Sequence, residues 1–111
     1  AGLATTPLAY SGEVEHFKGK PSKSLEQAVS NFSEYNSKLE QVLNRELTPE
    51  AMNEVHQLTY TLENALGKIN AEFDALAETL ETIHIASEHA DPDTVKTSGE
   101  KFLSVSREVI E

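Results

Sequence analysis

The chain has 111 residues, a formal net charge of −10 and no cysteine. This length allows one domain with a modest core. The negative charge argues against a nucleic-acid-binding protein, because such proteins need a basic patch that displaces counterions from phosphates. The lack of cysteine excludes a disulfide framework, thiolate metal sites and thioether-linked haem. No apolar run is long enough for a membrane span.

Residues 1–11 are uncharged, small and largely apolar, and charged residues begin abruptly at Glu13. Ala9 and Ser11 are small residues at the −3 and −1 positions of a cleavage before Gly12. This pattern predicts the trailing half of a secretory signal, so we expect a periplasmic or secreted protein. A flexible tail is the alternative interpretation.

An arm and then a helical domain are expected after this segment. Residues 12–23 contain two glycines and a proline without a helical pattern, which predicts an extended arm. The domain occupies 24–111. Ser24 and Gln27 have the spacing of a capping box, in which each side chain accepts a hydrogen bond from the other's backbone N–H. They begin a helix predicted over about 24–45.

Two later helix starts share one arrangement. Thr48-Pro49-Glu50 and Asp91-Pro92-Asp93 each provide a cap residue, a proline at the first helical position and a carboxylate in the first turn. They predict helices over about 49–90 and 92–110. The fold class is therefore all-α.

The long middle segment decides the architecture. Its apolar residues recur at steps of three and four, as in an amphipathic helix: Val55, Leu58, Leu62, Leu66, Ile69, Phe73, Leu76, Leu80 and Ile83. A turn at Gly67 is the alternative, and it would break this helix into a hairpin. We expect a continuous helix, because Leu66 and Ile69 keep the phase of the stripe across the glycine. Unbroken, it would be about 60 Å long.

The helix lengths favour a dimer. The first and last helices together match the long one, and folding back antiparallel they would cover its two halves in turn. Such a layer leaves one side of the stripe uncovered and needs a partner. An antiparallel homodimer centred near Asn70 would build four-helix cross-sections. If the chain turns at Gly67 instead, the result is a monomeric up-down four-helix bundle.

Three stretches carry a resemblance to a known family: Val14–Pro21, Leu25–Asn36 and Val55–Leu66. They resemble a family of small exported proteins of marine and halophilic proteobacteria that has only a domain-of-unknown-function label. The resemblance covers 13–110, implies export and an all-helical fold, and assigns no activity.

A looser likeness, in length and helix layout, is to the periplasmic b-type cytochromes built as four-helix bundles. Those proteins bind haem through a methionine near the start of the first helix and a histidine on the last. Here the first helix has no methionine and the last has no histidine. That haem site does not transfer to this chain.

The long helix carries two candidate ligands, His56 and His84. Each follows a stripe residue, and their mean position is residue 70, so an antiparallel dimer or a hairpin would bring them to the same height. With Met52 one turn before His56, they could bind haem b or a divalent metal. Glu81 and His84 match the Glu-x-x-His spacing of di-iron bundles. Hydrogen-bonded boundary histidines are the alternative interpretation.

A polar and aromatic cluster is the other candidate site. Counting outward from the first interhelix loop places Tyr35 and Asn36 beside Tyr60 and His56, with Asn64 one turn further along the helix. A buried polar network that fixes helix register is one interpretation, and a small-ligand pocket is the other.

The sequence therefore predicts an exported, helical binding or association protein without catalytic activity, most simply a homodimer. Another periplasmic protein or a small ligand is a further possible partner. A periplasmic haem or metal carrier that uses His56 and His84 is the alternative function. No nucleophile elbow, glycine-rich phosphate loop or zinc-protease signature occurs.

Overall fold

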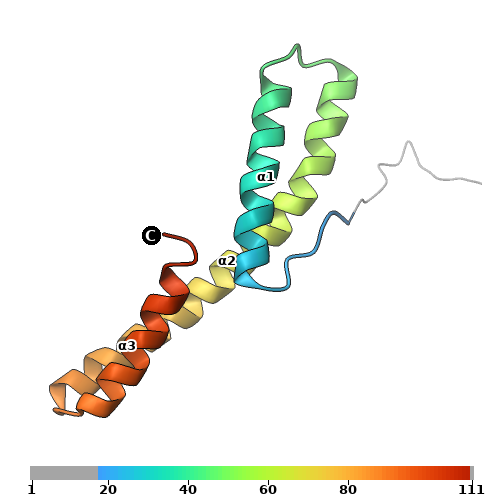
Figure 1. Ribbon diagram of the computed structural model, residues 1–111. Helices are drawn as coiled ribbons and strands as arrows, with labels where there is room; N and C mark the ends of the chain where they lie inside the picture. Colours follow the sequence, from blue (N-terminus) through green and yellow to red (C-terminus); the bar gives the residue numbers. More distant parts are fainter. Residues whose placement is uncertain (1–17, 111) are drawn as a thin grey trace, which may run out of the picture.

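The computed structural model describes residues 18–110, and these form three α-helices without a strand (Figure 1). The helices are α1 (Leu25–Leu43), α2 (Pro49–Glu88) and α3 (Pro92–Ser106). The predicted all-α class is confirmed, and each helix ends two to four residues before its predicted limit. The expected signal remnant and the first half of the arm lie outside the described residues.

The predicted caps begin all three helices. The Ser24 hydroxyl accepts a hydrogen bond from Gln27 N–H at 3.1 Å. The Gln27 side chain reaches past Ser24 and accepts from Lys23 N–H at 2.6 Å, so the capping box closes one residue earlier than predicted. Thr48 Oγ1 accepts from Ala51 N–H at 3.1 Å at the start of α2. These bonds satisfy amides that the helix itself leaves unpaired.

Asp91 caps α3 with both carboxylate oxygens. One accepts the Thr94 hydroxyl at 2.7 Å and the other accepts Thr94 N–H at 3.3 Å. The hydroxyl bond first, and then the amide bond, hold the pKa of Asp91 below its usual value. Because the folded-state pKa is lowered, this contribution to stability is present above the usual pKa and is lost as the pH falls through the lowered one.

The helix α2 runs unbroken through Gly67 over 40 residues. The hairpin alternative, with its monomeric four-helix bundle, is therefore wrong. The helix ends in a Schellman turn, in which Asp91 N–H bonds to Ala86 O at 3.0 Å. Ala90 takes the left-handed position of this turn at φ 53°, which glycine usually occupies.

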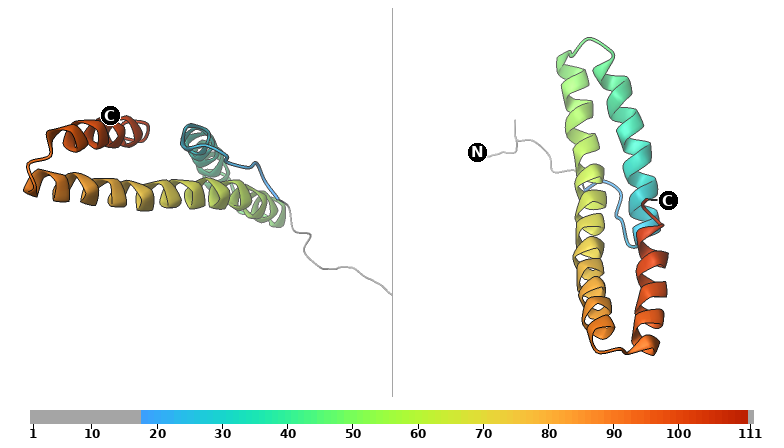
Figure 2. Two further views of the ribbon diagram at one scale, coloured as in Figure 1. Left: turned by 90° about the horizontal axis from the view of Figure 1, so that it is seen from below. Right: turned by 90° about the vertical axis from the view of Figure 1, so that its left-hand side faces the viewer.

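The two shorter helices lie end to end along α2 (Figure 2). In antiparallel orientation, α1 packs on its first half and α3 on its second, and they do not pack on each other. The end of α3 approaches the start of α1 above Lys68 and Glu72, where all three helices line one shallow cavity. The two short helices thus lie along the two halves of α2 in turn, although their 19 and 15 residues together are shorter than the 40 of α2.

The resulting body is long and thin. Its principal extents are 70 × 36 × 17 Å. The radius of gyration is 20.9 Å, against about 13 Å for a compact domain of this length.

Small side chains form most of the interior. The buried apolar residues of the described chain are Leu25, Ala28, Val42, Ala51, Ala65 and Ala86. The largest side chain buried to less than 2% exposure is that of Thr61. No residue of α3 is buried. One copy of the chain thus leaves most of its large apolar side chains in contact with water.

The continuous helix predicts that Gly67→Ala stabilises the protein. No atom lies within 4 Å of the position that an added Cβ would occupy. Alanine is favoured over glycine in a helix interior by about 0.5–1 kcal/mol. Thermal unfolding followed by circular dichroism, at matched protein concentration, should show a higher midpoint. A lower midpoint would mean that residue 67 needs the backbone freedom of a turn.

Candidate binding surface on the long helix

The described part of the arm lies directly on the backbone of α2. Gly19 has φ 74°, and a Cβ built on it would lie 2.7 Å from Thr61 N and 3.0 Å from Tyr60 C. Lys20 N–H donates to Thr61 Oγ1 at 2.9 Å. Only glycine permits both this backbone conformation and this close approach. The arm therefore crosses α2 at a fixed point.

Two asparagines hold the arm on either side of that crossing. The Asn64 amide donates to Lys18 O at 3.1 Å and to Lys20 O at 2.9 Å. The buried Asn31 amide on α1 donates to Pro21 O and to Ser22 Oγ, both at 3.2 Å. These bonds form a polar network that fastens the arm to α1 and α2, and in it the exposed Asn64 binds the arm rather than the predicted cluster.

The rest of the predicted polar cluster has different partners. The Tyr35 ring lies 5.7 Å from Lys20 Nζ and 4.6 Å from Lys38 Nζ. Both ammonium groups lie 3.5 Å from the Glu34 carboxylate. Asn36 is exposed. Tyr35 thus belongs to an exposed charged group, in which ion pairs contribute little to stability.

The two candidate histidines lie far apart in one chain. His56 Nε2 is 3.2 Å from the Tyr60 hydroxyl, and the two rings meet edge to face. His84 is exposed and lies 3.3 Å from Glu88. Twenty-eight residues of unbroken helix hold the two histidines about 42 Å apart. One chain does not assemble the residues predicted to bind haem or metal, so that alternative stays a prediction that needs a second chain.

The described residues contain no group of three or more potential metal ligands. Glu81 is exposed on the same helix as His84, and the bond that His84 makes is to Glu88. Met52 is 56% exposed. None of the three helices combines the length and apolarity that crossing a membrane requires.

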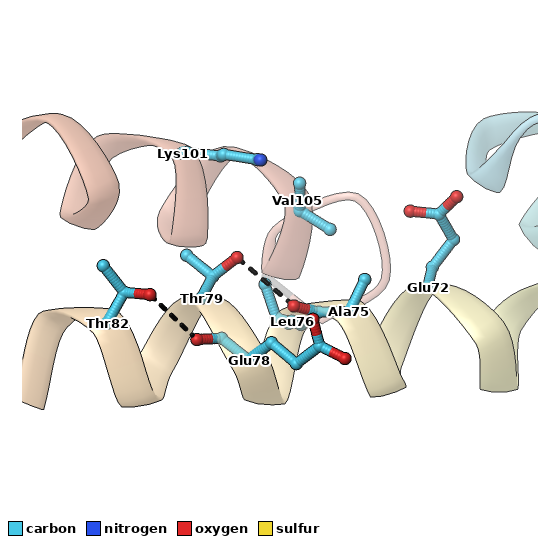
Figure 3. A pocket seen from close by; sticks show the side chains of 8 residues that line it. All are labelled: Glu72, Ala75, Leu76, Glu78, Thr79, Thr82, Lys101 and Val105. Carbon is cyan, nitrogen blue, oxygen red and sulfur yellow. Dashed lines mark hydrogen bonds between the residues drawn. The ribbon is translucent and has the colours of Figure 1, made fainter.

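An open groove of about 350 Å³ lies between α2 and α3 (Figure 3). Lys101 and Val105 of α3 lie above Leu76, Thr79 and Thr82 of α2. Thr79 and Thr82 donate their hydroxyls to backbone carbonyls one turn earlier in α2. These hydroxyls are therefore already engaged. The groove offers no nucleophile paired with a base, so it supports no catalytic assignment.

The most extensive surface feature is a heptad pattern along α2. Positions spaced alternately by three and four residues are apolar with one exception, and this is the spacing of a coiled-coil seam. The a row is Met52, Thr59, Leu66, Phe73 and Leu80, and the d row is Val55, Leu62, Ile69, Leu76 and Ile83. We call these ten residues the α2 seam; only Thr59 is polar.

The flanking helices leave the a row of this seam uncovered and the d row partly covered. In the a row, Met52 is 56% exposed, Leu66 46%, Phe73 37% and Leu80 50%. The d row is half-buried. The row that α1 and α3 bury is the adjacent one, where α2 has the small residues Ala51, Ala65 and Ala86. An exposed apolar stripe this long is typical of an interaction surface.

A family of unknown function, DUF6746, matches residues 1–111. The chain belongs to this family. The predicted resemblance to a family of unknown function is thereby confirmed, although the match says nothing about bacterial origin or cytochromes. No curated protein and no solved structure matches the chain.

The close contact of the arm predicts that Gly19→Ala releases it. The added methyl group would collide with Thr61 in a conformation that already disfavours alanine by about 1–2 kcal/mol. We expect faster hydrogen exchange at Lys20 N–H and faster trypsin cleavage after Lys23. Gly99→Ala is the matched control, since that position is open. Equal protection in the two variants would contradict the contact.

Proposed function

We propose that this DUF6746 protein is an exported association protein without catalytic activity, and that it binds a helical partner along the α2 seam. The uncovered a row is the observation that carries this proposal. A second copy of the chain is the simplest such partner, in keeping with the homodimer predicted from the sequence.

Two properties of the chain support the proposal. The heptad repeat runs through both halves of α2. Each short helix packs on only one half, so packing against α1 or α3 does not explain why the repeat spans the whole helix. The interior of one copy contains few large side chains. Covering the seam would bury apolar surface worth about 25 cal/mol per Å².

Export is supported by composition. The uncharged residues 1–11 end in Ala9 and Ser11 before the charged arm, as at a signal cleavage site. A cysteine-free, acidic chain is compatible with an oxidising exterior.

The seam predicts a strong contrast in photo-cross-linking. Benzoyl-phenylalanine is placed at Phe73, on the seam, or at Ile85, which is 45% exposed on the outer face of the same helix. Irradiation of intact cells should give a discrete protein adduct from position 73 only.

Either of two results would overturn the proposal. One is an equal yield from both positions, and the other is no adduct from position 73 in folded, expressed protein. The mass of the adduct, measured after protease digestion, identifies the partner without assuming that it is a second copy.

Export predicts a mature chain that begins at Gly12. Mass spectrometry of protein from the periplasmic fraction should find this N-terminus, and Ala9→Asp should block its formation because the −3 position requires a small neutral residue. Full-length chain confined to the cytoplasmic fraction would contradict export.

A further inference from the structure

We infer that the partner of the α2 seam is a second copy of this chain, bound antiparallel about a two-fold axis between residues 67 and 68. This inference rests on the proposed function, since it names the occupant of the same surface. Three observations support it: the seam pairs with itself when one copy is reversed, its a row is exposed, and the carboxylates are unevenly distributed between the two halves of α2.

The seam matches itself when one copy is reversed. In an antiparallel pair each a residue shares a layer with a d residue of the partner. If Leu66 faces the partner's Ile69, then Phe73 faces the partner's Leu62, Leu80 the partner's Val55, Met52 the partner's Ile83 and Thr59 the partner's Leu76. Every seam residue then has a counterpart. The axis lies within about one residue of the midpoint of Pro49–Glu88.

A shift by one layer gives a poorer match. With the axis at residue 71, Ser87 enters a layer opposite the partner's Val55, while Met52 falls outside the paired region. A polar residue replaces an apolar one, and an exposed methionine stays exposed. The axis between 67 and 68 is therefore the favoured register.

Two other directions around α2 are already occupied within one copy. The arm is held by Thr61 and Asn64, which lie about 140° around the helix from the seam. The flanking helices bury the row of Ala51, Ala65 and Ala86. A second α2 on the seam stands roughly at right angles to them. Each cross-section then contains α1, α2, the partner's α2 and the partner's α3, which is a four-helix bundle.

Charge favours the antiparallel orientation. The second half of α2, from residue 69 onward, has no lysine or arginine and five carboxylates: Glu72, Asp74, Glu78, Glu81 and Glu88. The first half has three, Glu50, Glu54 and Glu63, together with Lys68. A parallel pair would set the two more acidic halves side by side, whereas an antiparallel pair separates them and opposes the helix dipoles.

The seam is long enough for a specific interface. Met52 to Ile83 spans about 46 Å, and a strip about 10 Å wide gives roughly 460 Å² per copy. Stable interfaces bury about 800 Å² per partner. The proposed dimer therefore requires α1 and α3 to contribute the remaining area through contacts with the second copy.

The register also decides where the histidines meet. His56 and His84 both occupy e positions beside the seam, and reversing one copy places e positions opposite each other. In the favoured register, His56 and the partner's His84 are offset by about 7.5 Å along the axis. In the shifted register the offset is about 3 Å, which would create a pair of facing imidazoles.

Disulfide trapping in the purified full chain tests this inference, because the chain has no cysteine of its own. Val55→Cys, Leu62→Cys and Leu80→Cys proteins are mixed in pairs, oxidised and identified by mass. We expect Val55→Cys to cross-link with Leu80→Cys, and neither with itself. Light scattering of the unmodified chain should give about twice 12.2 kDa. Leu80→Glu should reduce the mass to the single value, while the equally exposed Ile85→Glu leaves it doubled.

Each other outcome overturns a defined part of the inference. Self-cross-linked Leu80→Cys would establish a parallel pair. Cross-linking of Leu62→Cys with Leu80→Cys would establish the shifted register, with His56 facing the partner's His84. A mass of 12.2 kDa at tens of micromolar would overturn the second copy as partner. Photo-cross-linking at Phe73 would then be the remaining test of the proposed function. Failure of the dimer inference can therefore be told apart from failure of the proposed function.

Discussion

The rest of the structure depends on two features of α2: it is one unbroken helix, and α1 and α3 both pack on the same side of it. A helix of 40 residues is longer than any compact domain of this size can enclose. Because α1 and α3 follow one another along the same row of small residues, they leave the adjacent row of large ones uncovered. The thin body and the sparse interior both follow from this arrangement, and so does the exposed apolar stripe.

Small and large apolar residues of α2 lie on different rows of the helix. Ala51, Ala65 and Ala86 let the short helices approach closely, so intramolecular packing is achieved with little apolar area. The larger side chains of Leu66, Phe73 and Leu80 lie on the a row instead, where they stay exposed. A chain that packed only on itself would be expected to place its large side chains between its own helices. The a row of α2 thus stays outside the intramolecular packing.

Local signals made much of the fold predictable. Ser24, Thr48 and Asp91 each act within three residues of their own position, and they mark the helix starts correctly. The apolar pattern keeps its phase across Gly67, and this local signal correctly predicted a continuous helix. The arm could not be placed from sequence, because its contact joins Gly19 to Thr61 across 42 positions. Asn31 was missed, since it looks like any polar residue of an amphipathic helix until its bonds to the arm are seen.

The end-to-end placement of α1 and α3 has a consequence for unfolding. Each forms a hairpin with α2, and the two hairpins are joined through one shared helix rather than through each other. Contacts in both are local in sequence, which favours rapid formation. The α2–α3 hairpin lacks the arm and has no buried residue in its short helix, so it is the weaker of the two. We therefore expect it to open first, with the α1–α2 hairpin still intact, as two cooperative units of unequal stability would.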